Sequence, residues 1–266
     1  MDILTITTKA DLIGHEANIE RLFQECFGSR LSLDLWRWAY LDNPNGEPIV
    51  SLCYDDDVLV GHYAVIPMPL TSESGGLNSY LSMTTMVASS HRKHGIFVKL
   101  AEDTYRHALE VGVDLVVGFP NEMSVSGFRK RLNWSLPPSD FVASLDKEEL
   151  IAAAKRHNLA GKGCFKLSLT DRRTLGWRTS RPGATYVCMD GLVYKEFQNN
   201  IDLIYFDSLD SLAALPTHQK VNVLMPAVAK ELSSQKCFGY QFGGISLNKG
   251  FEPDQIMRQM ALSDVF

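Results

Sequence analysis

The sequence predicts a mixed α/β fold of the α+β type, in which a mixed sheet is flanked by helices. Three observations support this prediction. Along the first half of the chain, apolar runs of strand length alternate with segments whose apolar residues recur at helical spacing. A strand at 80–87 passes through a polar loop directly into a helix at 96–110. A short apolar run at 114–119 then suits a buried strand.

The ends of these elements follow from local chemistry. Gly28 and Gly112 each close a helical pattern, as glycine commonly does just after a helix. Ser32 is a suitable N-cap, and the helix that follows it stops at Asn43-Pro44. Three consecutive aspartates at 55–57 indicate a hairpin turn. The expected order is a strand at 3–8, helices at 11–27 and 32–43, strands at 49–54, 58–67 and 80–87, a helix at 96–110, a strand at 114–119 and a short helix at 124–131.

The second half of the chain carries a weaker signal. We expect a first domain at 1–136, a junction with one helical segment at 137–165, and a C-terminal domain at 166–266. Trp36-Arg37-Trp38 and Trp177-Arg178 each precede a proline and an extended run, and both duplication and coincidence explain so short a match. The elements expected in the C-terminal domain are strands at 184–189, 191–197 and 202–206 and helices at 208–215 and 227–235.

Composition narrows the function classes. The 266 residues include 26 Lys and Arg against 31 Asp and Glu, a net charge of -5. The chain therefore lacks the excess of positive charge that is typical of proteins that bind nucleic acid or an anionic membrane surface. No apolar stretch is long enough to span a bilayer, and the N-terminus lacks a signal-peptide pattern. The five cysteines are widely spaced and odd in number, so we expect reduced thiols, no metal site and a cytoplasmic location.

The most informative segment is the loop at 88–95 between the expected strand and helix. Backbone N–H groups at a helix N-terminus form a natural cradle for a phosphate, and Arg92 and Lys93 add positive charge. A solvated basic turn before a helix would have the same pattern. On the residues alone, the loop is therefore either an anion site or a solvated basic turn that binds no ligand.

This segment resembles the signature of GNAT acyltransferases, in which Arg/Gln-x-x-Gly-x-Gly/Ala opens a helix. Here Arg92-Lys93-His94-Gly95-Ile96-Phe97 stands in that place, and Val87 also matches the family in spacing. The sequence departs from the pattern at Ser89, where proline is usual, at Lys93, and at Phe97, where a small residue is usual. Residues 60–67 and 127–134 resemble flanking family segments, so the resemblance extends over about half of the chain. It implies a GNAT-like sheet, and we expect the C-terminal half to be a second GNAT-like or partial unit.

The resemblance also implies a cofactor site. The family binds acetyl-CoA, and its fourth strand pairs with the pantetheine arm as an added strand would. Carried over by position, the pantetheine contacts fall on Thr85, Met86 and Val87. The pyrophosphate contacts fall on a run of five loop residues: Arg92, Lys93, His94, Gly95 and Ile96.

Asn121 ends the last strand of the first half, where the family has an asparagine that faces the cofactor; it also suits a helix cap. The family often uses a tyrosine seven residues later to protonate the leaving thiolate. That position is Phe128 here, or Arg129 if a one-residue offset near Asn133-Trp134 is taken up differently, so another group or water must act. For the general base, His62 is the histidine expected on a strand of the sheet, although the same position also suits a histidine that only packs or faces solvent. Glu122 is the second candidate and Thr84 a third.

Together these expectations describe an N-acyltransferase that moves an acetyl group from coenzyme A to a primary amine of a small molecule. An amino sugar is one acceptor that the resemblance suggests, and a homodimer is left open. The alternative is a GNAT-like protein that binds a ligand or partner without catalysis. The departures at Phe97 and Phe128 favour the alternative, while Arg92, Gly95 and Asn121 favour the enzyme.

Overall fold

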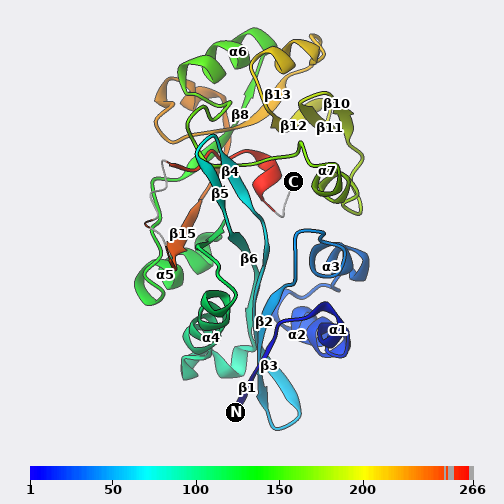
Figure 1. Ribbon diagram of the computed structural model, residues 1–266, viewed down its shortest axis with the longest axis vertical. Coiled ribbons are helices and arrows are strands. Elements are labelled where there is room, and N and C mark those ends of the chain that lie inside the picture. Colours follow the sequence, from blue (N-terminus) through cyan, green and yellow to red (C-terminus); the bar gives the residue numbers. More distant parts are fainter. Residues whose placement is uncertain (249, 251–254, 264–266) are drawn as a thin grey trace.

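The computed structural model describes residues 1–248, 250 and 255–263, and its architecture is two six-stranded sheets with helices around them (Figure 1). A small three-stranded sheet, β5-β4-β9, lies between the two halves of the chain. The elements of the first half are β1 (Asp2–Ile6), α1 (Lys9–Ile13), α2 (Glu16–Phe27), α3 (Leu33–Tyr40), β2 (Ile49–Asp55), β3 (Val58–Pro67), β4 (Leu70–Ser72), β5 (Gly75–Leu77), β6 (Ser79–Val87), η1 (Ser89–His94), α4 (Ile96–Glu110), β7 (Leu115–Gly118) and α5 (Glu122–Arg131).

The first sheet has the order β1-β2-β3-β6-β7-β15. Its neighbours are antiparallel except for β6 and β7, which run parallel. Helices α1–α3 cover one face and α4 the other (Figure 1). The buried side chains of α2, α4 and the central strands form one hydrophobic core. The mixed sheet flanked by helices that the sequence predicts is therefore confirmed.

Local signals place most element ends of this unit correctly. Ser32 caps α3 by accepting a hydrogen bond from the Leu35 N–H, and Gly28 ends α2 with φ of 71°. The helix expected at 11–27 is wrong in one respect: the chain breaks at Gly14 into α1 and α2, because the Gly14 and His15 N–H groups bond back to Asp11 and Leu12 as a turn.

The second sheet has the order β10-β11-β12-β13-β8-β14. It repeats the pattern of the first, since antiparallel neighbours lead to a single parallel pair, β12 and β13, followed by antiparallel neighbours again. A second sheet-based unit in the C-terminal half is therefore confirmed. The elements of the C-terminal half of the chain are β8 (Asp140–Leu145), α6 (Lys147–Arg156), β9 (Lys166–Leu167), α7 (Arg172–Thr179), β10 (Val187–Met189), β11 (Leu192–Phe197), β12 (Asn200–Phe206), η2 (Asp210–Ala214), β13 (Val221–Met225), η3 (Lys230–Gln235), β14 (Lys236–Tyr240), β15 (Gly243–Ser246) and η5 (Met260–Leu262).

The helices expected at 208–215 and 227–235 are wrong in type, because η2 and η3 there are short 3₁₀ turns. Such turns are tighter than an α-helix and rarely extend beyond a few residues.

One strand crosses between the two units. β15 follows all the strands of the second sheet along the chain but pairs with β7 of the first sheet, and Gly244 also bridges to Ser135. The segment expected to be a junction, 137–165, carries β8 and α6, and β8 pairs with β13 and β14 of the second sheet. The first sheet is therefore completed by a strand from the C-terminal half of the sequence.

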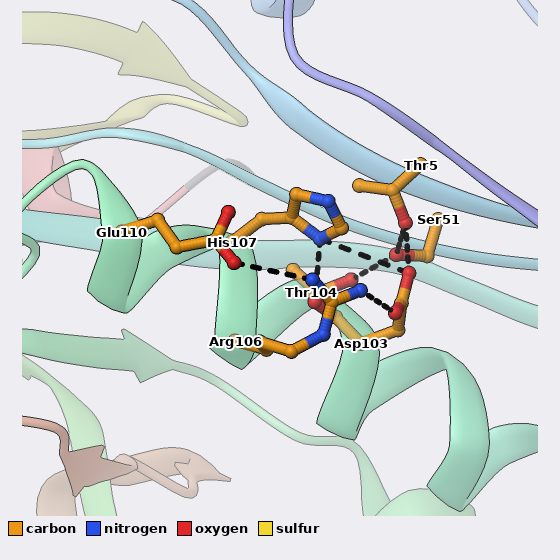
Figure 2. A network of polar contacts seen from close by, with 7 residues as sticks. All are labelled: Thr5, Ser51, Asp103, Thr104, Arg106, His107 and Glu110. Atoms are coloured by element: carbon orange, nitrogen blue, oxygen red, sulfur yellow. Dashed lines mark hydrogen bonds and ion pairs between the residues drawn. The ribbon is translucent and has the colours of Figure 1, made fainter.

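A polar network holds α4 against the edge of the first sheet (Figure 2). Ser51 Oγ lies 2.8 Å from Thr5 Oγ1 and accepts a hydrogen bond from Thr104 Oγ1 at 2.8 Å. Thr5 also donates to Asp103, which is paired with Arg106. Although burial opposes it, the bonds from Thr5 and Arg106 hold the pKa of Asp103 below its usual value. The network fixes α4, and with it the loop at the N-terminus of α4.

Candidate active site

The parallel pair β6 and β7 separates part-way along its length. Pairing runs from Ser79 with Leu115 to Ser82 with Gly118. β6 then continues to Val87, whereas β7 ends at Gly118. On its other side β6 remains paired with β3. The β6 backbone beyond Ser82 therefore presents a strand edge with no β7 partner among the described residues.

A cleft of ≈ 870 Å³ opens where the two strands separate. Residues of both units line it, so one wall of the cleft is built by the C-terminal half of the chain. Its charged lining residues, within the described part of the chain, are Glu122 and Lys236. The remaining lining residues are Phe27, Ser82, Met83, Thr84, Thr85, Gly118, Phe119, Pro120, Asn121, Ser124, Val125, Phe128, Trp134, Ser139, Gly239, Tyr240 and Gln241.

A β-bulge interrupts β6 at the cleft. His62 pairs with Met86 and Ala64 with Met83, so Thr84 and Thr85 together stand opposite a single residue of β3. Thr84 has φ of 50°, in the left-handed region that a β-branched residue rarely adopts. Bulges bend a strand and redirect its backbone groups, and they occur often beside active sites. The separation of β6 from β7 begins next to this bulge.

The loop that resembles a phosphate cradle folds as the 3₁₀ turn η1 followed by Gly95 and α4. Gly95 has φ of 71°, and nothing lies within 4 Å of where its Cβ would be. No side chain caps the helix, so the first-turn N–H groups of Ile96 and Phe97 are left for an external acceptor. Arg92 and Lys93 are exposed beside them. These residues fit an anion such as a pyrophosphate.

Phe97 does not crowd this loop, despite the small residue usual at its position. Its ring packs with Tyr63 and Phe128, at centroid distances of 6.2 and 5.4 Å. The ring also lies over Gly127 in α5, where an added Cβ would stand 3.2 Å from it. Because residue 127 is a glycine, the Phe97 ring has room to turn away from the loop.

Phe128 confirms that the family's phenol is missing from its usual place. The side chain is 5% exposed and packs edge-on against Trp134, with ring centroids 4.5 Å apart. A phenyl ring has no proton to donate. The described residues that line the cleft and can transfer protons are Glu122, Lys236 and Tyr240.

The position of His62 does not fit the role of general base. The residue is 0% exposed and is absent from the cleft lining. Its Nδ1 lies 2.6 Å from the Thr84 carbonyl oxygen, and its ring meets Tyr40 edge-on. Burial lowers the pKa of His62 from 6.5 to about 4. Sequence patterning places His62 on a strand correctly, but it does not reveal that both faces of β3 are buried.

Asn121 and Glu122, by contrast, both line the cleft. Asn121 caps α5, since its Oδ1 accepts the Ser124 N–H at 3.0 Å. The helix-cap role considered for Asn121 is thus present, at a position that also faces the cleft. Glu122 begins α5 with an exposed carboxylate. Of the three candidate bases, Glu122 and Thr84 line the cleft and His62 does not.

The C-terminal half contributes cleft residues that sequence reasoning missed. Tyr240 stacks on Phe119 at the end of β7, with ring centroids 4.8 Å apart, and its hydroxyl bonds to Ser263. Lys236 and Gln241 come from the same stretch of chain. No local pattern could have found them, because β14 reaches the cleft only through long-range pairing with β8.

Comparison with known proteins agrees with this geometry. A family model described as the acetyltransferase (GNAT) domain matches residues 14–136. The chain contains a GNAT acetyltransferase domain. The match covers the first sheet except for β1 and β15, together with the loop and the cleft wall at Asn121. No curated protein matches the chain significantly.

Solved structures extend the likeness beyond the GNAT domain. A GCN5-related N-acetyltransferase from Kribbella flavida has a TM-score of 0.62 and 11% identity, covering 93% of this chain and 72% of that chain. Eis1 from Mycobacterium abscessus has a TM-score of 0.57 at 11% identity, covering 93% and 74%. A GCN5-related N-acetyltransferase from Anabaena variabilis has a TM-score of 0.55 at 10% identity, covering 93% and 73%. At these identities the likeness concerns the fold, and it includes the second unit.

In the part of the chain that the structure describes, no group of three or more His, Cys, Asp and Glu residues could hold a metal ion. The same part contains no helix that is long and apolar enough to cross a membrane.

Proposed function

We propose that this protein is an N-acyltransferase that moves an acetyl group from acetyl-CoA to a primary amine of a small molecule. The single observation that carries the proposal is the separation of β6 from β7 beside a bulge, which leaves an unpaired strand edge along a large cleft. The GNAT domain match supports the acyltransferase class.

The residues of the cleft and loop fit this cosubstrate. Thr85, Met86 and Val87 lie on the unpaired β6 edge, so their backbone groups would pair with the amides of the pantetheine arm. The turn formed by Arg92, Lys93, His94, Gly95 and Ile96 would hold the pyrophosphate through backbone N–H groups and positive side chains. Asn121 would face the arm from the opposite wall of the cleft. When bound, acetyl-CoA supplies an activated thioester.

Acyl transfer also requires that an amine loses a proton and that a thiolate departs. We assign the first task to Glu122, directly or through one water, because its carboxylate lines the cleft. The phenol that lines the cleft is Tyr240, which makes it the candidate to protonate the thiolate in place of Phe128. Both assignments use side chains that reach the cleft in this structure.

The acceptor that the cleft suits is a compact molecule with one amine. The wall contributed by Glu122 and Lys236 is close to neutral, so it lacks the negative charge that would attract a polycation. Phe119 and Tyr240 offer a stacked aromatic surface to a flat or apolar part of the acceptor. A monoamino sugar satisfies these conditions, as does an arylalkylamine.

Calorimetry with acetyl-CoA and desulfo-CoA tests the cosubstrate, and a panel of amino sugars, arylalkylamines and amino acids tests the acceptor. We expect acetyl-CoA to bind and at least one amine to cause release of free thiol. Absence of acetyl-CoA binding would contradict the proposal. Binding without acylation of any amine would instead favour a GNAT-like protein that binds a ligand without catalysis, which the phenyl ring at Phe128 favours on its own.

A further inference from the structure

The bulge in β6 is held in an unfavourable backbone conformation. Thr84 has φ of 50° although threonine is β-branched, and such a conformation is strained in a non-glycine residue. It persists only where the surrounding structure fixes it. Something in the neighbourhood of Thr84 must therefore hold this turn of the strand.

The group that contacts the bulge is the imidazole of His62. Its Nδ1 lies 2.6 Å from the Thr84 carbonyl oxygen. A carbonyl can only accept, so Nδ1 carries the proton in this bond. The other ring nitrogen, Nε2, is buried and has no hydrogen-bond partner among the described residues. The ring therefore makes one polar contact, and that contact is to the displaced carbonyl of the bulge.

Packing alone does not account for a histidine at this place. Burying a nitrogen without a hydrogen-bond partner is unfavourable, so an apolar side chain would fill the same space at lower cost in free energy. What an apolar residue would lose is the donor to Thr84. Pairing of β6 with β7 ends at Ser82, and the bulge lies just beyond that point. The bulge therefore sets the direction of the stretch of strand edge that lines the cleft.

We propose that His62 is a positioning residue, whose Nδ1–H holds the Thr84 carbonyl and thereby fixes the β6 edge in the orientation that receives the acyl donor. The inference rests on the proposed function for its last step only. Its structural step, that His62 maintains the bulge, concerns the protein without any ligand.

Two substitutions separate the hydrogen bond from the packing. His62→Asn keeps an N–H donor close to the position of Nδ1, whereas His62→Leu fills the space without a donor. We expect His62→Leu to speed amide hydrogen exchange at 84–87 in the free protein and to weaken acetyl-CoA binding about tenfold, the effect of one lost hydrogen bond. His62→Asn should stay within about threefold of the parent in both measurements.

A third substitution tests the same point from the other partner. Thr84→Gly removes the conformational strain, because glycine adopts positive φ readily. The double variant His62→Leu/Thr84→Gly should therefore recover most of the exchange protection and of the acetyl-CoA affinity that His62→Leu loses. This rescue is specific to a bulge-holding role, since a histidine that only fills space gains nothing from a glycine at 84.

The outcomes are distinguishable. Unchanged exchange and unchanged binding in His62→Leu would overturn the inference, as would equal losses in His62→Asn and His62→Leu without rescue by Thr84→Gly. If the rate of acyl transfer in His62→Asn no longer rises with pH as it does in the parent, His62 acts as a base. That result would also overturn the inference. If the parent protein itself binds no acetyl-CoA, the proposed function fails, while the exchange measurements still decide whether His62 holds the bulge.

Discussion

Trp38 and Trp177 are joined by two reciprocal hydrogen bonds, in which the indole N–H of each residue donates to the backbone carbonyl of the other. Nε1 of Trp38 donates to the Trp177 carbonyl at 2.6 Å, and Nε1 of Trp177 donates to the Trp38 carbonyl at 2.7 Å. The rings stack with centroids 5.2 Å apart, and the Arg178 guanidinium lies over both. These residues belong to the two echoing sequence segments, so α3 and α7 meet through a reciprocal contact between the two units.

Replacing either tryptophan by phenylalanine should destabilise the protein measurably. Trp177→Phe keeps a ring but leaves the Trp38 carbonyl buried without its donor, which should lower the free energy of unfolding by about 1–3 kcal/mol. Trp36→Phe is the matched control in the same helix, because Trp36 Nε1 is buried without a partner among the described residues. Urea denaturation of the three proteins would test this. A larger loss in Trp36→Phe than in Trp177→Phe would contradict the assignment.

Gly95→Asp should weaken binding of acetyl-CoA. The substitution places a carboxylate among the N–H groups at the start of α4, where we expect the pyrophosphate, and like charges at close range should cost about 2–4 kcal/mol of binding. Gly95→Asn is the control, since asparagine also tolerates the positive φ at this position but carries no charge. Calorimetry compares the two. Equal affinities in both variants would remove the loop from the cofactor site.

Glu122→Gln should reduce acyl transfer while leaving acetyl-CoA binding intact. Loss of a general base typically lowers a rate by about 10²–10⁴. Glutamine keeps the size and the position at the start of α5, so the fold should not change. The measurement is kcat/KM for an amine acceptor across a range of pH, alongside the Kd for acetyl-CoA. A full rate in the variant would assign proton removal to solvent or to another group.

The buried His62 should make stability depend on pH. Its pKa of about 4 in the folded protein lies below the ordinary value of 6.5, so between these values the unfolded chain binds a proton that the folded protein does not. Stability should therefore fall as pH is lowered from 6.5 towards 4, by about 3 kcal/mol from this residue. His62→Asn lacks this contribution. Parallel unfolding curves for the parent and His62→Asn over that range would contradict the prediction.

Gly243→Ala should disturb β15, the strand of the C-terminal half that pairs with β7. The added methyl would collide with the Leu136 side chain and would lie 2.8 Å from the Ser135 carbonyl oxygen. Overpacking of this kind costs about 1–3 kcal/mol. Gly176→Ala is the control, because nothing lies within 4 Å of that position and alanine favours a helix. Thermal unfolding should show a lower Tm for Gly243→Ala and an equal or higher Tm for Gly176→Ala.

Local sequence chemistry predicts the first unit well. The cap at Ser32, the glycine stop at Gly28, the hairpin around 55–57 and the helix at 96–110 each depend on residues that are close in sequence, and each is present.

Long-range features could not be predicted in the same way. The pairing of β15 with β7, and of β8 with β13, depends on contacts between distant segments whose own residues encode only strand propensity. The burial of His62 depends on helices covering both faces of β3, and the presence of Tyr240 in the cleft depends on the pairing of β14 with β8. The pattern of apolar residues predicts whether a segment forms a helix or a strand, but it does not predict which segments pack beside it.

The late position of β15 has a consequence for how the chain is made. As synthesis proceeds, the first sheet ends at an open β7 edge, whose partner near Gly243 emerges from the ribosome only after the strands of the second sheet. β8, meanwhile, has neither neighbour until β13 and β14 follow. Open strand edges favour pairing with other chains. A nascent or prematurely terminated chain should therefore need protection from aggregation, and a fragment of the first half that lacks β15 should not complete its sheet.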